Sequence, residues 1–137
     1  MPTPAEMTAL INTHLEREAA GDAAGAVAVY TDDVVHDVVG SPMGVLSGPK
    51  AAETFYEHLV HDLKIARMDK VREGFGEDFT VVEHVVDAAV PGTFLGIEGQ
   101  GRSVHFRMLH VFDFRDGKIS RENVWLDGGT IAYQLSS

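Results

Sequence analysis

The stretch Tyr30-Thr-Asp-Asp-Val-Val-His-Asp-Val-Val-Gly40 marks the point where the chain changes from helical to extended structure. Within it, residues 34–39 are predicted to form a short buried strand because of their valine content. Side chains alternate between the two faces of a strand, so Asp37 is assigned to the same face as Val35 and Val39. A carboxylate on an apolar face is costly to bury without a partner. We therefore predict that Asp37 lies at the bottom of an apolar pocket.

Helical periodicity surrounds this strand on both sides. A first helix is predicted from Glu6 to about Ala20, and Asp22 is expected to cap a second helix that reaches Tyr30. A third helix is predicted to begin near Pro49, whose fixed φ suits a first turn, and to end near Lys64. Three helices are therefore expected before the main run of strands.

After the third helix the apolar period changes from helical to alternating. Four strands and a short final helix are predicted at Ile65–Phe75, Phe79–Val90, Val104–Phe114, Ile119–Leu126 and Ile131–Leu135. Helices that precede an antiparallel meander are typical of an α+β domain with helices on one sheet face. We predict a single domain over residues 1–137, in which a curved, mostly antiparallel sheet forms a cone and three helices cover its concave face.

Length and charge restrict the class of protein. The chain has 137 residues and a formal net charge of −10, with 21 acidic against 11 basic side chains. Such a balance argues against binding to nucleic acid or to an anionic membrane surface. No apolar run approaches the roughly 18 residues of a transmembrane helix, and the N-terminus lacks the apolar segment of a signal peptide. With no cysteine for disulfides, a cytoplasmic location is expected.

Three ionisable side chains occupy faces that otherwise look buried. Asp37 is one, His14 falls in the apolar stripe of the first helix, and His110 shares a strand face with phenylalanine and methionine. One histidine on an apolar face is more often a hydrogen-bonded core residue. Three such groups in one small domain favour a shared polar site, because buried polar groups need partners. His84 alternates with valines and belongs either to the pocket wall or to the core.

Two sets of motifs carry a resemblance to known families. The first set resembles the ketosteroid isomerase pattern: Gly21-Asp22, Tyr30-Thr-Asp-Asp, His36-Asp-Val-Val-Gly40, Ser47-Gly-Pro and Phe55-Tyr56. The second resembles SnoaL-like polyketide cyclases still more closely: Gly92-Thr-Phe-Leu-Gly-Ile, Val104-His-Phe-Arg, Phe112-Asp-Phe-Arg-Asp-Gly-Lys-Ile and Gln134-Leu135. Both families have the nuclear transport factor 2-like fold, a helix-covered cone. The resemblance spans nearly the whole chain and implies that fold here.

The resemblance also implies roles for individual residues. Asp37 matches the general base of the isomerases, and Tyr56 matches a tyrosine that supports their catalytic one. The catalytic tyrosine itself falls on His14, and the protonated aspartate of the oxyanion hole falls on His110. The catalytic aspartate of the cyclases falls on Val124. The chain therefore departs from both families at catalytic positions.

The leading hypothesis is a small cofactor-independent enzyme that acts on a hydrophobic polyketide- or steroid-like substrate. Asp37 would move a proton while His14 or His110 stabilises an oxyanion. A second hypothesis pairs Asp37 with His110 to activate water against an epoxide, as related epoxide hydrolases of this fold do with carboxylates. A non-catalytic ligand-binding module, or an assembly domain whose pocket is filled, are further alternatives. Predicted substrate-binding residues are Tyr56, Phe55, Val35, Phe106, Met108, Phe112, Val124 and Leu126.

Two surface features complete the predictions. His58, His61 and Asp62 fall within one helical turn, but they point away from the apolar stripe, so a solvated face is preferred over a metal site. Neither a metal nor a cofactor is predicted. Trp125 is out of phase with its apolar strand neighbours and is assigned to the convex sheet face with Leu109 and Val111. An exposed apolar sheet face is usually an interface, so we predict a homodimer through it.

Overall fold

The computed structural model describes residues 1–136 of the chain. The helices are α1 (Pro4–Ala19), α2 (Ala23–Val27), α3 (Pro49–Asp62) and α4 (Gly128–Leu135). The strands are β1 (Tyr30–Val39), β2 (Val45–Ser47), β3 (Lys64–Phe75), β4 (Phe79–Val90), β5 (Thr93–Phe94), β6 (Ile97–Glu98), β7 (Arg102–Arg115) and β8 (Lys118–Leu126).

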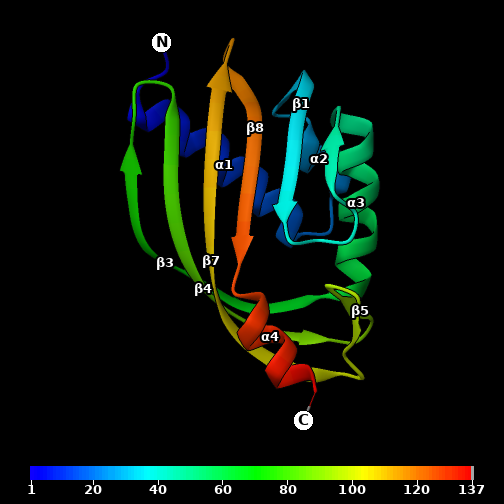
Figure 1. Cartoon of the computed structure of the whole chain (residues 1–137). Helices are drawn as coiled ribbons and strands as arrows, with labels where there is room; N and C mark the ends of the chain where they lie inside the picture. Colours follow the sequence, from blue (N-terminus) through cyan, green and yellow to red (C-terminus); the bar gives the residue numbers. More distant parts are fainter. Residues whose placement is uncertain (137) are drawn as a thin grey trace.

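Six strands form one sheet in the order β2-β1-β8-β7-β4-β3. All neighbouring strands are antiparallel except β1 and β8, which run parallel. Figure 1 shows that the long strands bend, that α1 crosses behind the sheet and that α3 flanks its β1 edge. The predicted α+β architecture, a curled and mostly antiparallel sheet with three helices on its concave face, is confirmed. The fourth helix, α4, packs against β7.

Local sequence signals explain where the helices begin. Thr3 and Glu6 form a capping box at the start of α1, in which each side chain accepts a hydrogen bond from the other residue's backbone N–H. Asp22 caps α2 and Asp127 caps α4 through the same kind of bond. One predicted boundary was wrong: α2 ends at Val27, and β1 already begins at Tyr30. The predicted loop between β4 and β7 contains the β5–β6 hairpin.

The apolar core has two parts. One packs α1 onto the sheet, with Met7 and Ile11 against Phe112 and Ile119. The other lies under α4 and includes Phe106. Truncating a buried phenylalanine such as Phe112 to alanine costs about 3–5 kcal/mol, so these clusters hold the curl of the sheet in place. Within residues 1–136, no helix has both the length and the apolar content needed to span a membrane.

Candidate active site

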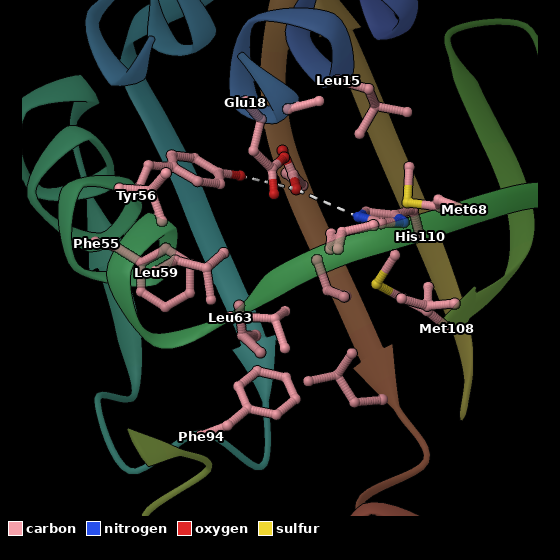
Figure 2. A pocket seen from close by; sticks show the side chains of 18 of the residues that line it. Leu15, Glu18, Phe55, Tyr56, Leu59, Leu63, Met68, Phe94, Met108 and His110 are labelled. Atoms are coloured by element: carbon pink, nitrogen blue, oxygen red, sulfur yellow. Dashed lines mark hydrogen bonds and ion pairs between the residues drawn. The ribbon is translucent and has the colours of Figure 1, made fainter. Parts of the chain in front are cut away.

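A cavity of about 340 Å³ lies between the concave face of the sheet and helices α1 and α3. Most side chains that line it are apolar. In Figure 2 the carboxyl group of Glu18, the hydroxyl of Tyr56 and the imidazole of His110 converge at one end, whereas Leu63 and Phe94 lie towards the other. The cavity therefore has a polar end and an apolar end, which is the usual design of a small-molecule site.

Glu122 of β8 is the charged centre of the polar end. Alternation along β8 places it on the concave face with Val124 and Leu126, and only 1% of the residue is exposed. The Tyr30 hydroxyl donates a hydrogen bond to Oε1 of Glu122 (2.6 Å), and the Tyr56 hydroxyl donates to Oε2 (3.2 Å). Hydrogen bonds to an ionised carboxylate are stronger than neutral ones, so both phenols stabilise the negative charge.

Histidines from three different elements surround the same carboxylate. The Nε2 atom of His14 on α1 lies 3.0 Å from Oε1 of Glu122. The Nε2 atoms of His110 on β7 and His36 on β1 lie 3.5 and 3.9 Å from Oε2. Burial alone would raise the pKa of Glu122, but the charge of His14, its hydrogen bond and the interaction with His110 hold that pKa well below its usual range. Glu122 is therefore a buried anion at neutral pH.

His14 is the cation that balances this anion. Its Nδ1 lies 2.8 Å from the Ala26 carbonyl oxygen, which can only accept a hydrogen bond, so Nδ1 carries a proton. Its Nε2 faces the Glu122 carboxylate, which also accepts. Burial by itself lowers the pKa of His14, but Glu122, with a smaller contribution from Glu18, raises it to about 9. The pair is an imidazolium–carboxylate ion pair in the core.

Glu18 supplies a second carboxyl group at the polar end. It follows His14 by one helical turn on α1, and its Oε2 lies 3.7 Å from His14 Nε2. The side chain is 22% exposed, and Glu18 lines the cavity. Burial raises the pKa of Glu18, the negative charge of Glu122 adds to that rise, and His14 and His110 oppose it. The two carboxyl groups therefore differ in protonation preference although both lie within 4 Å of one imidazole nitrogen.

His36 joins the cluster through Tyr56, with 2.9 Å between its Nε2 and the hydroxyl oxygen. Its Nδ1 is buried and has no hydrogen-bond partner among the described residues. Burial lowers the pKa of His36, and the nearby His14 and His110 lower it further. His36 is therefore uncharged at neutral pH, and it forms part of the cavity wall.

Comparison with known proteins agrees with this fold. A family model for the SnoaL-like polyketide cyclases matches residues 9–135. The chain belongs to this family. A search of curated proteins found no significant match.

Solved structures share the fold of this SnoaL-like chain at low sequence identity. A candidate polyketide cyclase from Xanthomonas campestris pv. campestris is 21% identical with a TM-score of 0.80, over 96% of this chain and 97% of the other. A second, from Silicibacter sp. TM1040, is 23% identical with a TM-score of 0.81, over 96% of each chain. An LEH-like epoxide hydrolase from M. tuberculosis is 18% identical with a TM-score of 0.77, over 98% of this chain and 92% of the other. At these identities the likeness establishes the fold alone.

The structure places Asp37 differently from the sequence prediction. Val34, His36 and Val38 are the buried residues in the second half of β1, so Asp37 points to the opposite face, where the Asn123 amide donates a hydrogen bond to its carboxylate (3.2 Å). The prediction that Asp37 lies in the pocket was wrong, and so was the assignment of Val35 to the cavity wall. Valine pairs flank His36 and Asp37 on both sides, so apolar alternation fitted either face equally well.

Other predicted site residues of this SnoaL-like chain are brought together. His14, His110 and Tyr56 meet around Glu122, as described above. The predicted lining residues found in the cavity wall are Phe55, Phe106, Met108, Val124 and Leu126. Phe112 lies behind the wall and stacks on the His110 ring, with centroids 5.1 Å apart and planes 6° from parallel. The catalytic roles assigned to His14 and His110 remain predictions.

Sequence reasoning missed both carboxyl groups of the site. The signals were present, since Glu122 alternates with Val124 and Leu126, which were already assigned to the pocket. Glu18 follows His14 at the spacing that places two side chains on one helix face. Within residues 1–136, no group of three or more histidine, aspartate or glutamate side chains has an arrangement suited to a metal ion.

Proposed function

We propose that this SnoaL-like chain is an enzyme of the cyclase or isomerase type, in which its own side chains perform acid–base chemistry on an uncharged, hydrophobic small molecule. The observation that carries the proposal is the carboxyl pair. The pKa of Glu122 is held well below its usual range, whereas burial raises that of Glu18, although both face the polar end of one apolar cavity. Paired titratable groups with pKa values pushed apart are a mark of acid–base sites.

The two groups have complementary tasks. The Glu18 carboxylic acid donates a hydrogen bond or a proton to the substrate oxygen as negative charge develops on it. The Glu122 carboxylate accepts the proton that the substrate releases from carbon. Three donors, the two phenols and His14, weaken Glu122 as a base, but His110 can take the proton onward when its Nε2, 3.5 Å from Oε2, carries no proton. His14 and the two phenols keep the carboxylate in position throughout.

The lining of the cavity defines the class of substrate. Apolar side chains such as Phe55, Leu59 and Phe94 favour a hydrophobic ring system. The ionised Glu122 at the reacting end would repel a carboxylate substrate, and His14 is already paired with Glu122. An enolisable ketone of polyketide- or steroid-like shape meets both requirements.

Hydrogen exchange at carbon tests the proposal without knowledge of the final product. The protein is incubated in D₂O with a bicyclic enone and with an aromatic β-keto ester, and deuterium at the α-carbon is followed by NMR. The wild type is expected to catalyse exchange, and Glu18→Gln is expected to lower the rate about a hundredfold, the low end for a positioned acid. Glu16→Gln, on the exposed side of the same helix, is the matched control and keeps the wild-type rate. Tight binding of either ketone without exchange would instead identify a ligand-binding module.

The same pair of carboxyl groups favours epoxide opening as a second candidate. Glu18 would protonate the epoxide oxygen while Glu122 and His110 activate a water molecule, in place of the pairing of Asp37 and His110. One structure of this fold is that of an LEH-like epoxide hydrolase. An apolar 1,2-epoxide in H₂¹⁸O distinguishes the candidates, because hydrolysis places one labelled oxygen in the diol. If the ketone exchanges deuterium and no labelled diol forms, only the cyclase or isomerase candidate remains.

A further inference from the structure

A second cavity lies beside the first, with a volume of about 180 Å³. Leu15 of α1 and Met68 of β3 border both cavities and so form the wall between them. The second cavity is more polar, since its lining includes Thr8, Asn12, Lys70, Glu73 and His84. Lys70 and Glu73 form an ion pair of 3.0 Å at partly exposed positions, so this cavity adjoins the protein surface.

His84 and His110 connect the two cavities. They lie diagonally across the β4–β7 pairing on the concave face, because His84 pairs with Met108 and His110 pairs with Val82. Their ring centroids are 5.9 Å apart and the rings are perpendicular. His110 borders the first cavity and His84 borders the second.

In each of the two imidazoles, one ring nitrogen makes no hydrogen bond to the described residues. The Nδ1 atoms of His84 and His110 are both buried and have no hydrogen-bond partner among the described residues. Leaving a buried polar atom unpaired costs on the order of 1–3 kcal/mol, so two such atoms in adjacent rings need an explanation. A contact between neighbouring rings, direct or through one water molecule, would satisfy them.

We propose that His110 and His84 form a proton-transfer path from Glu122 to the second cavity. Glu122, once protonated by the substrate, gives that proton to the unprotonated Nε2 of a neutral His110 whose own proton is on Nδ1. His110 releases its Nδ1 proton to His84, and His84 releases one proton to water in the second cavity. Each imidazole gains one proton and loses one, so no charge remains on the path. The inference rests on the proposed acid–base function, because that reaction supplies the proton.

The groups around His110 explain why the proton leaves through the second cavity and not through the first. A hydrophobic substrate in the first cavity excludes water from the polar end, so release through the substrate entrance is blocked during the reaction. His14 cannot carry the proton, since its two nitrogens face the Ala26 carbonyl and Glu122. The Nε2 atom of His36 faces Tyr56 and Glu122, and His36 borders the first cavity but not the second. Burial, with His110 and Lys70, lowers the pKa of His84 to about 4, so an uncharged imidazole stands at the exit at neutral pH.

The first test measures the path with the first cavity filled by an apolar ketone that has no α-hydrogen, so that water is excluded from that side and no turnover occurs. The exchange of the His110 ring proton with solvent is followed by ¹⁵N-edited NMR in the wild type, in His84→Gln and in His84→Phe. Exchange is expected to slow at least about tenfold in both variants. His58→Gln, at an exposed helical histidine, is the matched control and leaves exchange unchanged. Should both His84 variants fail to fold, Asn12→Trp closes the second cavity from α1 without altering either histidine, and the same slowing is expected. Unchanged exchange in a folded variant would overturn the path.

The second test measures turnover in the deuterium assay. His84→Gln is expected to lower kcat about tenfold, to leave KM unchanged and to recover with added imidazole, which a purely structural defect would not do. A wild-type kcat in His84→Gln would overturn the path while the proposed function stands. Absence of exchange in the wild type would count against the proposed function, and the NMR measurement would still decide the path.

Discussion

Two buried glutamates, Glu122 and Glu83, lie on opposite faces of the same sheet and have different partners. Glu122 faces the concave side, where imidazoles and phenols surround it. Glu83 of β4 faces the convex side, where Nε of Arg72 lies 3.0 Å from Oε1 and Nε of Arg107 lies 3.1 Å from Oε2. The residues are only 1% and 9% exposed, and both carboxyls have a lowered pKa. Burial and charge alone therefore do not separate a reactive carboxylate from a structural one.

Glu83 and Glu122 differ in the class of side chain that surrounds the carboxylate. A guanidinium stays protonated at any physiological pH, so Glu83 belongs to a permanent ion pair. An imidazole can both accept and release a proton, and we propose that His110 takes the proton from Glu122. Glu122 also borders a cavity that can hold a substrate, whereas Glu83 borders neither of the two cavities described above. These two differences are the reason why we propose Glu122, and not Glu83, as the reactive carboxylate.

The largest expected effect is on turnover. Glu122→Gln is expected to lower α-carbon exchange by at least about a hundredfold, because the amide cannot accept the proton. Glu83→Gln is the matched change on the other face and is expected to keep the wild-type rate. Both variants are compared in the deuterium assay after their fold has been verified by circular dichroism. Equal loss of activity in the two variants would remove the distinction between the two carboxylates.

The next effect is on stability as a function of pH. The pKa of His14 in the folded chain, about 9, lies above its ordinary value of 6.5. The ion pair with Glu122 therefore stabilises the fold fully below pH 6.5, and this contribution is lost as the pH rises through 9. The wild type is expected to lose on the order of 3 kcal/mol of unfolding free energy between pH 6 and pH 10.

Urea denaturation at pH 6, 8 and 10 measures this contribution. His14→Gln is expected to flatten the dependence between pH 6 and pH 10. Glu83→Gln is expected to keep the wild-type slope, because its arginine partners do not titrate in this range. A steep slope that persists in His14→Gln would assign the effect to another group.

A smaller effect concerns the convex face around Glu83. Trp125 is 42% exposed there and pairs across the strands with Leu109 and Val39. We expect a homodimer through this apolar band, and Trp125→Glu is expected to weaken it at least about tenfold, since a charge is costly at an interface core. Light scattering at micromolar concentration, with Trp125→Phe as control, measures the oligomeric state. A monomeric wild type would contradict this expectation.

The smallest effect is expected at Asp37. Asp37→Asn is expected to leave α-carbon exchange within about twofold of the wild type and the unfolding free energy within about 0.5 kcal/mol, as for most partly exposed changes. Its single amide partner, Asn123, can still bond to asparagine. The deuterium assay and urea denaturation measure both. Loss of activity in this variant would restore Asp37 as a base and break the assignment to Glu122.

The sequence by itself determined the fold class and most of the cavity wall. Helical periodicity before residue 64 and alternation after it imply a sheet with helices on one face, and the caps at Asp22 and Asp127 follow from local hydrogen bonding. Placing Phe106, Met108 and His110 on one face required only the two-residue period of β7.

Only the tertiary structure decided which carboxylate faces the cavity. In β1 the valine pairs around His36 and Asp37 made both faces look apolar. Because Val34 and Val38 pack into the core, His36 and not Asp37 lies on the cavity face. Glu122 became the centre of the site because α1, β1, β7 and β8 bring their polar groups to one point. A periodic pattern assigns a residue to a face within its own element. The groups that set its charge lie up to 108 residues away along the chain, as His14 and Glu122 do, and only folding brings them together.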